Sequence, residues 1–198
     1  MKLAIISDVH GNYPALKKVL ERIDSLEVDK IISLGDVTGY YAQPNKCINL
    51  LREKNAHQLL GNHDMYLING EGCPRSRLIS ELLIHQQKDV SKDNISYLKT
   101  LKPILNKDST SFVHGGWNDN LDEYMFKITY EKLVGEHDFY FSGHTHVQIK
   151  STIKDKTYCN PGSVGQPRDG DPRAAFCTFI DNQITLYRVS LHIETIPV

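Results

Sequence analysis

The sequence has 198 residues, of which 40% are hydrophobic, so a sizeable core can form without a disulfide or metal staple. A formal net charge of -1 argues against a nonspecific nucleic-acid-binding protein, because such proteins carry a strong basic excess. The four cysteines form no C-x-x-C pair and are expected to be reduced thiols. The apolar residues 1–7 are too short for a signal peptide, and no apolar stretch approaches the ~20 residues of a membrane span. We therefore expect a soluble, cytoplasmic protein with no membrane partner.

The first half of the chain alternates predicted strands and helices. Residues 3–6 form a continuous apolar run, as expected for a parallel strand that is buried on both faces. Apolar side chains then recur at helical spacing between residues 16 and 23, and further strands are predicted at residues 30–34 and 57–60. Pro44 opens a predicted helix between these two strands. Strand–helix–strand units of this length predict right-handed crossovers and a parallel sheet.

The second half begins with helices and ends with strands. Two helices are predicted around residues 78–83 and 95–98, and Pro103 stops the second of them. Further strands are predicted at residues 109–113, 139–141, 147–153, 174–180 and 184–189. The last two strands read as a closing hairpin. Since the sequence contains no repeat, low-complexity tract or linker, we expect residues 1–198 to form a single domain.

Five polar clusters share one position, because each directly follows a predicted strand. They are Asp8-Val9-His10, Gly35-Asp36, Gly61-Asn62-His63-Asp64, His114-Gly115 and Gly143-His144-Thr145-His146. Ligands of open α/β sheets bind beyond the carboxyl ends of the strands, so these side chains are expected to converge on one rim. Carboxylate, amide and imidazole groups without thiolates suit Mn²⁺, Fe, Co, Ni or Zn²⁺. A lone Asp-x-His or Gly-Asp is more often a turn or a helix cap, and only the whole set predicts a metal site.

The order of these clusters resembles the calcineurin-like metallophosphoesterase superfamily, in particular its small single-domain bacterial and archaeal branch. The resemblance covers residues 7–165, including the turn Asn160-Pro161-Gly162-Ser163. It implies the α/β class, with a four-layer α/β/β/α sandwich of two mixed sheets flanked by helices. It also implies a dinuclear phosphoesterase that hydrolyses a phosphodiester or nucleotide phosphate bond through a metal-bridging hydroxide.

The resemblance further implies the role of each residue in the clusters. Asp8, His10 and His146 would hold the first divalent ion, Asn62, His114 and His144 the second, and Asp36 would bridge the two. Manganese is the first expectation, with Fe, Ni, Co and Zn as alternatives. His63 lies beside a ligand without being assigned as one, so it is the candidate general acid. Asp64 is the candidate to orient the His63 ring, and its alternative reading is a surface or turn carboxylate.

The sequence says less about the substrate. Arg168 and Arg173 lie in the turn-rich loop 160–173, where they either bind a second phosphate or pair with neighbouring aspartates and order the loop. Asn12 either touches the substrate or serves helix entry. Aromatic residues near loops either stack on a nucleoside or pack in the core: Tyr40, Tyr41, Tyr66 and Trp117.

We expect a small phosphate ester as substrate, such as a nucleotide or dinucleoside polyphosphate, and no nonspecific nucleic-acid binding. The alternatives are a serine/threonine-type protein phosphatase or a phosphomonoesterase, and, as a weaker one, a non-catalytic interaction scaffold. A scaffold would be expected to lack the histidine at position 63, which is present. Self-association is left open.

Overall fold

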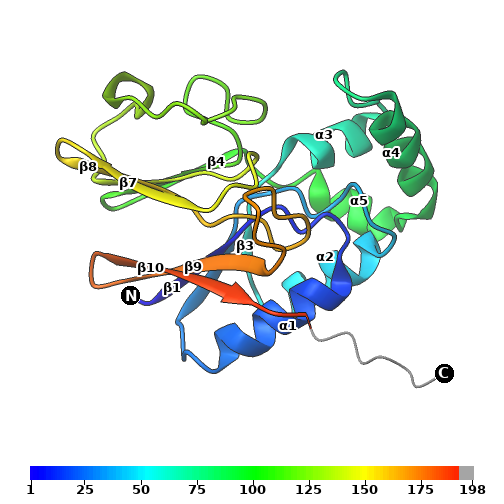
Figure 1. Cartoon of the computed structure of the whole chain (residues 1–198). Coiled ribbons are helices and arrows are strands. Elements are labelled where there is room, and N and C mark those ends of the chain that lie inside the picture. The colour runs from blue at the N-terminus through cyan, green and yellow to red at the C-terminus, as the bar shows by residue number, and fades with distance from the viewer. Residues whose placement is uncertain (192–198) are drawn as a thin grey trace.

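The computed structural model describes residues 1–191 and arranges their strands in two five-stranded mixed sheets (Figure 1). The first sheet has the order β10-β9-β1-β2-β3. Its strands are β1 (Leu3–Ile6), β2 (Lys30–Ser33), β3 (His57–Gln58), β9 (Ala174–Ile180) and β10 (Gln183–Val189). Strands β1, β2 and β3 pair in parallel, while β9 is antiparallel to both β1 and β10. The predicted parallel core and closing hairpin are therefore confirmed.

The second sheet has the order β4-β5-β6-β8-β7. Its strands are β4 (Ile104–Lys107), β5 (Thr110–Val113), β6 (Phe139–Phe141), β7 (Ile149–Ile153) and β8 (Lys156–Asn160). Strands β5, β6 and β8 are parallel, and β4 and β7 add antiparallel edges. Each sheet thus contains three neighbouring parallel strands, and the carboxyl ends of both sets point toward the same rim.

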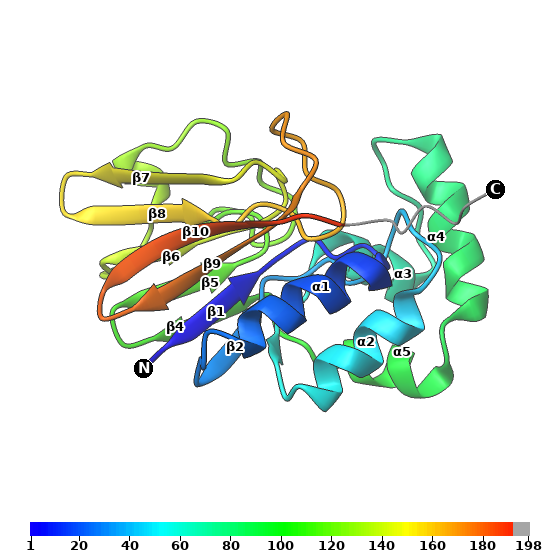
Figure 2. The ribbon, with the colours of Figure 1, turned by 60° about the horizontal axis from the view of Figure 1, so that its bottom comes forward.

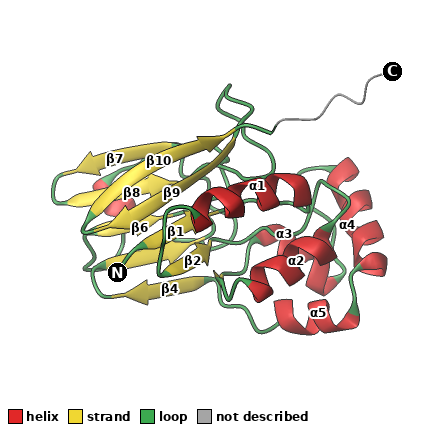
Figure 3. Ribbon diagram, turned by 90° about the horizontal axis from the view of Figure 1, so that it is seen from below, coloured by secondary structure: helices red, strands yellow, loops and turns green. Residues whose placement is uncertain are grey.

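Five α-helices belong to the described part of the chain: α1 (Tyr13–Asp24), α2 (Pro44–Glu53), α3 (Asn62–Asn69), α4 (Arg77–Asp89) and α5 (Lys92–Leu98). They lie on one side of the strands, and α1 runs along the first sheet (Figures 2 and 3). Helix α1 begins at Asn12, whose side chain accepts a hydrogen bond from the Ala15 amide. Its apolar stripe packs on Ala4 and Ile6 of β1 in one buried cluster. No helix in residues 1–191 is both long and apolar enough to span a bilayer.

The two sheets face each other across a second apolar cluster. Ile5 and Ile32 of the first sheet meet Phe112 and Phe141 of the second, and the two phenylalanine rings stack with centroids 5.0 Å apart. Large buried apolar side chains contribute about 1.5–3 kcal/mol each to folding. This apolar layer therefore holds the two sheets in a fixed relative position, and with them the ends of their strands.

The outer face of the second sheet is covered by the segment between β5 and β6. Met125 and Leu133 of this segment pack on Tyr140 and Tyr158 of the sheet. The segment is irregular except for one short 3-10 helix, η1 (Tyr130–Lys132). The predicted α/β architecture of two mixed sheets with flanking helices is confirmed, and its fourth layer is made mainly by this irregular segment.

Four elements were not predicted from the sequence: the short η1, β4, β8 and α3. Strand β4 is an edge strand whose last two residues are exposed, so its sequence carries no apolar run. The sequence of β8 mixes polar and apolar residues although most of it is buried. Helix α3 begins at Asn62, so the Asn62-His63-Asp64 cluster forms its first turn. Strand β3 ends at Gln58, earlier than predicted.

Candidate metal centre

The polar clusters meet where the parallel strands of both sheets end. Asp8 follows β1 and Asp36 follows β2, while His114 and His144 follow β5 and β6 of the other sheet. Their side chains and those of their cluster neighbours are at most 6% exposed: Asp8, His10, Asp36, Asn62, His63, His114, His144 and His146. Burying so many polar and ionisable groups is costly unless they bind something.

The backbone at this rim is strained. Asp8, His10, Asp36, His144 and His146 all have a positive φ, between 51° and 63°. Non-glycine residues adopt this conformation rarely, and such strain gathers at functional sites. The left-handed turns direct these side chains inward at the points where the strands end.

Two glycines allow the closest backbone approaches at the centre. A Cβ on Gly61 would lie 2.1 Å from Asp36 Oδ1, and one on Gly143 would lie 2.0 Å from Ser7 Oγ. A side chain at either position would force its neighbours to move. Gly61 thus lets the ends of β2 and β3 in the first sheet approach each other, and Gly143 lets the loop after β6 approach the end of β1 in the other sheet.

Backbone carbonyls fix the orientation of three imidazole rings. His10 Nδ1 lies 2.8 Å from Thr38 O, His114 Nδ1 3.1 Å from Leu34 O, and His146 Nδ1 2.7 Å from Gln166 O. Because a carbonyl oxygen only accepts hydrogen bonds, each Nδ1 must carry the proton and donate it. When such a ring is neutral, its Nε2 presents a lone pair to the centre, the arrangement that metal-binding histidines adopt.

The first group of candidate ligands combines Asp8, His10 and His146. The two Nε2 atoms lie 3.0 Å apart, and Asp8 Oδ1 lies 3.3 Å from that of His146 and 3.9 Å from that of His10. Burial holds the pKa of His10 well below its usual value, so its ring stays neutral. Converging lone pairs and a carboxylate suit a divalent cation.

The second group combines Asp36, His114 and His144, with Asn62 beside them. His114 Nε2 lies 3.3 Å from Asp36 Oδ2 and 3.0 Å from Asn62 Oδ1, while the buried His144 Nε2 has no hydrogen-bond partner. Burial lowers the pKa of His114, but the Asp36 carboxylate outweighs it and raises the pKa to about 9. This group therefore favours positive charge at the position where its ligand atoms converge.

Asp36 lies between the first group and the rest of the second. Its Oδ2 lies 3.7 Å from His10 Nε2 and 3.3 Å from His114 Nε2, while its Oδ1 accepts a hydrogen bond from the His63 amide. A third possible ligand group joins His10, Asp36 and His63. Asp36 Oδ2 thus lies near a ligand of each group, as a bridging carboxylate would.

His63 lies at the edge of the centre. Its ring is 4.9 Å from that of His10, and its Nδ1 is buried without a hydrogen-bond partner. Burial lowers the pKa of His63 although the Asp36 carboxylate raises it. Within the described residues, the Nδ1 of this imidazole therefore makes no structural hydrogen bond.

Asp64 does not contact the His63 ring, and the expectation that it orients this ring is wrong. Its carboxylate accepts hydrogen bonds from the amides of Asp36 at 2.8 Å, Thr38 at 3.0 Å and Gly61 at 3.2 Å. The Thr38 hydroxyl donates a further bond of 2.8 Å. Consecutive helical residues point in different directions, which separates Asp64 from the neighbouring ring. Asp64 instead holds the loop that carries Asp36.

The turn at residues 160–166 supports the centre from behind. The buried Ser163 hydroxyl donates to Asp8 O at 2.8 Å, and the Asn160 amide donates to Gly143 O at 2.6 Å. Gln166 supplies the carbonyl that orients His146. The sequence reading placed recognition in this loop, but its first part braces the ligands.

The three candidate substrate-binding residues, Arg168, Arg173 and Asn12, have different surroundings. Arg168 donates to the Tyr40 hydroxyl at 2.8 Å, and the Tyr40 ring lies 4.6 Å from the His10 ring. Arg173 instead pairs with Asp171 at 2.6 Å, as its alternative reading predicted. Asn12 uses both polar groups of its side chain, to cap α1 and to donate to Gly165 O. Only Arg168 of the three reaches the rim of the centre.

The aromatic candidates separate as well. Tyr66 lies near the centre with its ring 6.2 Å from that of His63, whereas Trp117 packs on Tyr140 beneath the irregular segment. Sequence reasoning missed Tyr124, whose ring lies 4.0 Å from that of His144. It comes from the irregular segment, where no periodic pattern signals which side chains point inward.

A polar network borders this second side of the centre and was also missed. Arg75 forms an ion pair with Asp122 and stacks over the Tyr124 ring with its guanidinium 5.4 Å from the centroid. Tyr66 donates to Asp122 at 2.7 Å. Tyr66 and Arg75 lie 56 and 47 residues before Asp122 in the sequence, so no local motif could have indicated the contact.

Comparison with known proteins agrees with this arrangement. Residues 1–183 match the family model of the calcineurin-like phosphoesterase superfamily domain. The uncharacterized protein MJ0912 of Methanocaldococcus jannaschii is 33% identical over 97% of this chain and 88% of its own length. The phosphodiesterase YfcE of Escherichia coli K12 is 26% identical over 93% of this chain and 89% of its own.

A solved structure shows the same fold. The metallophosphoesterase from Sphaerobacter thermophilus superposes with a TM-score of 0.85 at 30% sequence identity, covering 97% of this chain and 89% of that one. The family model spans most of the sequence, and the clusters that carried the resemblance lie within it. The chain therefore belongs to the calcineurin-like phosphoesterase superfamily and is a metal-dependent phosphoester hydrolase.

Proposed function

We propose that this protein is a dinuclear phosphodiesterase that hydrolyses a phosphodiester or nucleotide phosphate bond. The observation that supports this most is the position of Asp36 between two ligand groups, one with Asp8, His10 and His146 and one with His114 and His144. Asn62 completes the second group through its Oδ1. Two divalent ions, manganese first among the candidates, would be held by these seven side chains.

Two metal ions bound side by side supply Lewis acidity and a nucleophilic water at neutral pH. The chain's own contribution is to hold the ligands rigidly in buried positions and to leave one imidazole uncommitted. His63 lies beside the centre with Nδ1 unpartnered, so it can donate a proton to the departing alkoxide. The expected contribution of such a general acid is about 10²–10⁴-fold in rate.

The local charge supports an anionic substrate although the whole chain has a net charge of -1. The two carboxylates of Asp8 and Asp36 balance only part of the charge of two divalent ions, so the loaded centre stays positive. Arg168 at the rim adds a guanidinium that can bind a phosphate oxygen. The name of the similar protein YfcE, a phosphodiesterase, points to the diester rather than the monoester.

The first experiment measures hydrolysis of bis-p-nitrophenyl phosphate and p-nitrophenyl phosphate by metal-stripped protein re-supplied with Mn²⁺, Ni²⁺ or Zn²⁺. We expect metal-restored activity with a preference for the diester. Preference for the monoester, or for a phosphopeptide assayed beside it, would instead identify a phosphatase. No activity with two ions bound per chain would contradict the enzymatic proposal and favour a binding protein.

A further inference from the structure

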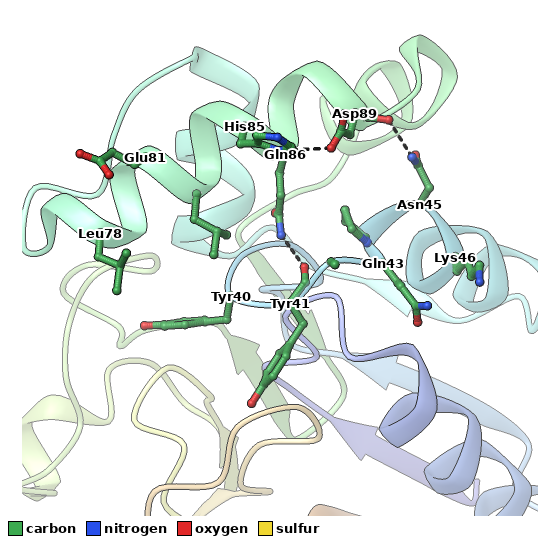
Figure 4. A pocket seen from close by; sticks show the side chains of 13 residues that line it. Tyr40, Tyr41, Gln43, Asn45, Lys46, Leu78, Glu81, His85, Gln86 and Asp89 are labelled. Carbon is green, nitrogen blue, oxygen red and sulfur yellow. Dashed lines mark hydrogen bonds and ion pairs between the residues drawn. The ribbon is translucent and has the colours of Figure 1, made fainter. Parts of the chain in front are cut away.

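A second concave site lies beside the metal centre. It is a cavity of about 600 Å³ between α4 and residues 40–46, the segment that leads into α2 (Figure 4). Figure 4 shows Leu78, Glu81 and His85 of α4 on one side of it and Tyr40 and Tyr41 on the other. Cavities of about 300–1,000 Å³ are typical of small-molecule sites. None of the candidate metal ligands lines it.

Tyr40 connects this cavity to the metal centre, because it borders both. Its ring lies 4.6 Å from that of His10 and 5.1 Å from that of His63, and the same side chain lines the cavity. A phosphodiester whose phosphate lies at the centre thus has one ester group within reach of the cavity. The Tyr40 hydroxyl also accepts a hydrogen bond from Arg168.

The lining of the cavity favours an uncharged, apolar group. Its apolar residues are Tyr40, Tyr41, Ala42, Pro44, Leu78 and Leu82. Leu78 is 71% exposed and Tyr41 is 41% exposed, so apolar surface on both walls faces water until something covers it. Covering this surface with a flat ring is favourable, since aromatic side chains and ring systems stack well.

The charged groups around the cavity do not favour a phosphate. Its described lining contains the carboxylates of Glu81 and Asp89, the ammonium of Lys46, the imidazole of His85 at 3.2 Å from Asp89, and no arginine. The cationic metal centre and Arg168 thus attract the anionic part of a substrate, and the cavity does not. Charge therefore divides the substrate between the two sites.

The wall that contains Tyr40 is fixed by a buried glutamine. Gln86 of α4 accepts a hydrogen bond from the Gly39 amide at 2.9 Å and donates to Tyr41 O at 2.6 Å. It also donates to Gly39 O at 3.2 Å, so it holds the backbone on both sides of Tyr40. The cavity is consequently preformed, which lowers the entropy cost of binding.

We propose that this cavity binds one ester substituent of the phosphodiester, an uncharged heteroaromatic group the size of a nucleobase. The inference rests on the proposed function for the position of the phosphate. Tyr40 is then a specificity-determining residue that separates the phosphate from the ring, and Leu78 and Leu82 cover the face of the ring opposite it.

The test compares two diesters with the same leaving group, p-nitrophenyl thymidine 5′-phosphate and methyl p-nitrophenyl phosphate, on Mn²⁺-loaded protein. Leu82→Trp fills the cavity, and Ile84→Trp places the same side chain on α4 at an exposed position outside the lining. We expect the wild type and Ile84→Trp to prefer the thymidine ester by about tenfold or more in kcat/KM. Leu82→Trp should reduce this preference to below about threefold.

A wild type without preference, or a Leu82→Trp variant that keeps it, would overturn the inference. Loss of the preference in Phe126→Ala would also overturn it. That result would mean that the substrate's ring binds at the exposed Phe126, which stacks on Tyr124 on the other side of the centre. Leu78→Ala, at a largely exposed position, serves if Leu82→Trp does not fold.

The same variants separate failure of the cavity from failure of the proposed function. If neither diester is hydrolysed with any metal, the proposed function fails, and thymidine binding measured by saturation-transfer NMR then tests the cavity alone. Binding to the wild type and to Ile84→Trp but not to Leu82→Trp would support the cavity. Equal signals from all three proteins, or none from the wild type, would overturn it.

Discussion

The Nε2 atoms of His10 and His146 face each other at a distance of 3.0 Å inside the protein. Both rings donate Nδ1–H to backbone carbonyls, so both facing atoms carry lone pairs. Two acceptors at this distance repel each other unless a cation lies near both. The chain thus positions both rings for one shared cation, and its left-handed turns maintain this arrangement.

Metal content distinguishes the bridging carboxylate from a ligand of one ion. Asp36→Ala should lose both ions, because Asp36 Oδ2 lies near His10 and His114 alike. His146→Ala should lose only the first ion, since His146 contacts Asp8 and His10 alone among the candidate ligands. Inductively coupled plasma mass spectrometry of dialysed proteins measures this, and an Asp36→Ala variant with two ions per chain would contradict the bridging role.

Asp64 should act on the metal centre through the backbone. Asp64→Ala leaves the amides of Asp36, Thr38 and Gly61 without their acceptor, so we expect a loss of about 3–5 kcal/mol in unfolding free energy and weaker metal binding. Thr38→Val removes only the hydroxyl bond and should cost about 1 kcal/mol. Urea denaturation measures both. Equal losses in the two variants would contradict the dominance of the backbone amides.

His63→Ala should keep the metal content of the wild type and lower turnover of alkyl esters by about 10²–10⁴-fold. The loss should shrink for leaving groups that are acidic phenols, because these depart without a proton. His57→Ala, at an exposed histidine on β3, is the matched control and should have no effect. Normal turnover of an alkyl diester by His63→Ala would refute the general-acid role.

The two arginines of the 160–173 loop should differ in their effects. Arg168→Ala removes the guanidinium beside Tyr40 and should raise KM by about tenfold, the value of one charge-assisted contact. Arg173→Ala removes an exposed pair with Asp171 and should leave both kcat and KM unchanged. Steady-state kinetics on one diester compares the variants, and an equal rise in KM would mean that the loop acts as a whole.

The base of this loop should show a pH-dependent stability. Burial raises the pKa of Asp169, but hydrogen bonds from Arg188 and the Gln148 amide outweigh it, so the net pKa lies below 3.8. The folded state thus binds this proton less readily than the unfolded state, and the contribution is present above pH ~4 and lost as the pH falls further.

Asp169→Asn should therefore cost about 1–3 kcal/mol at pH 7, and the difference from the wild type should shrink toward pH 3. Asp24→Asn breaks an exposed pair with Lys54 and serves as the control, with a loss below about 1 kcal/mol. Urea denaturation at both pH values measures this. A constant difference for Asp169→Asn would exclude titration of this carboxylate as its origin.

Much of the fold could be read from local patterns. The continuous buried runs of β1 and β2 and the helical spacing of apolar residues in α1 are local sequence patterns. Such patterns can be recognised from neighbouring residues alone. Strand β8 was missed because its burial is set by β6 and β7 on either side, which its own mixed sequence does not reveal. Edge strand β4 was missed for a similar reason.

The candidate ligands were likewise visible in the sequence, because each follows a strand and carries a metal-binding group. Asp8, Asp36 and His114 needed only the rule that parallel strands end at one rim. The role of Asp64 needed the tertiary structure, since its partners at residues 36 and 38 lie in another loop. Tyr124, which stacks on His144, comes from an irregular segment without any pattern.

The sequence by itself thus determined the family, the strand–helix order and the chemical groups of the metal centre. Only the tertiary structure decided which of Arg168 and Arg173 reaches that centre and that a cavity opens behind Tyr40. The reason is physical. Local sequence fixes backbone periodicity and side-chain chemistry, whereas the distance between residues from different loops depends on how the two sheets and the helices pack, which no short segment encodes.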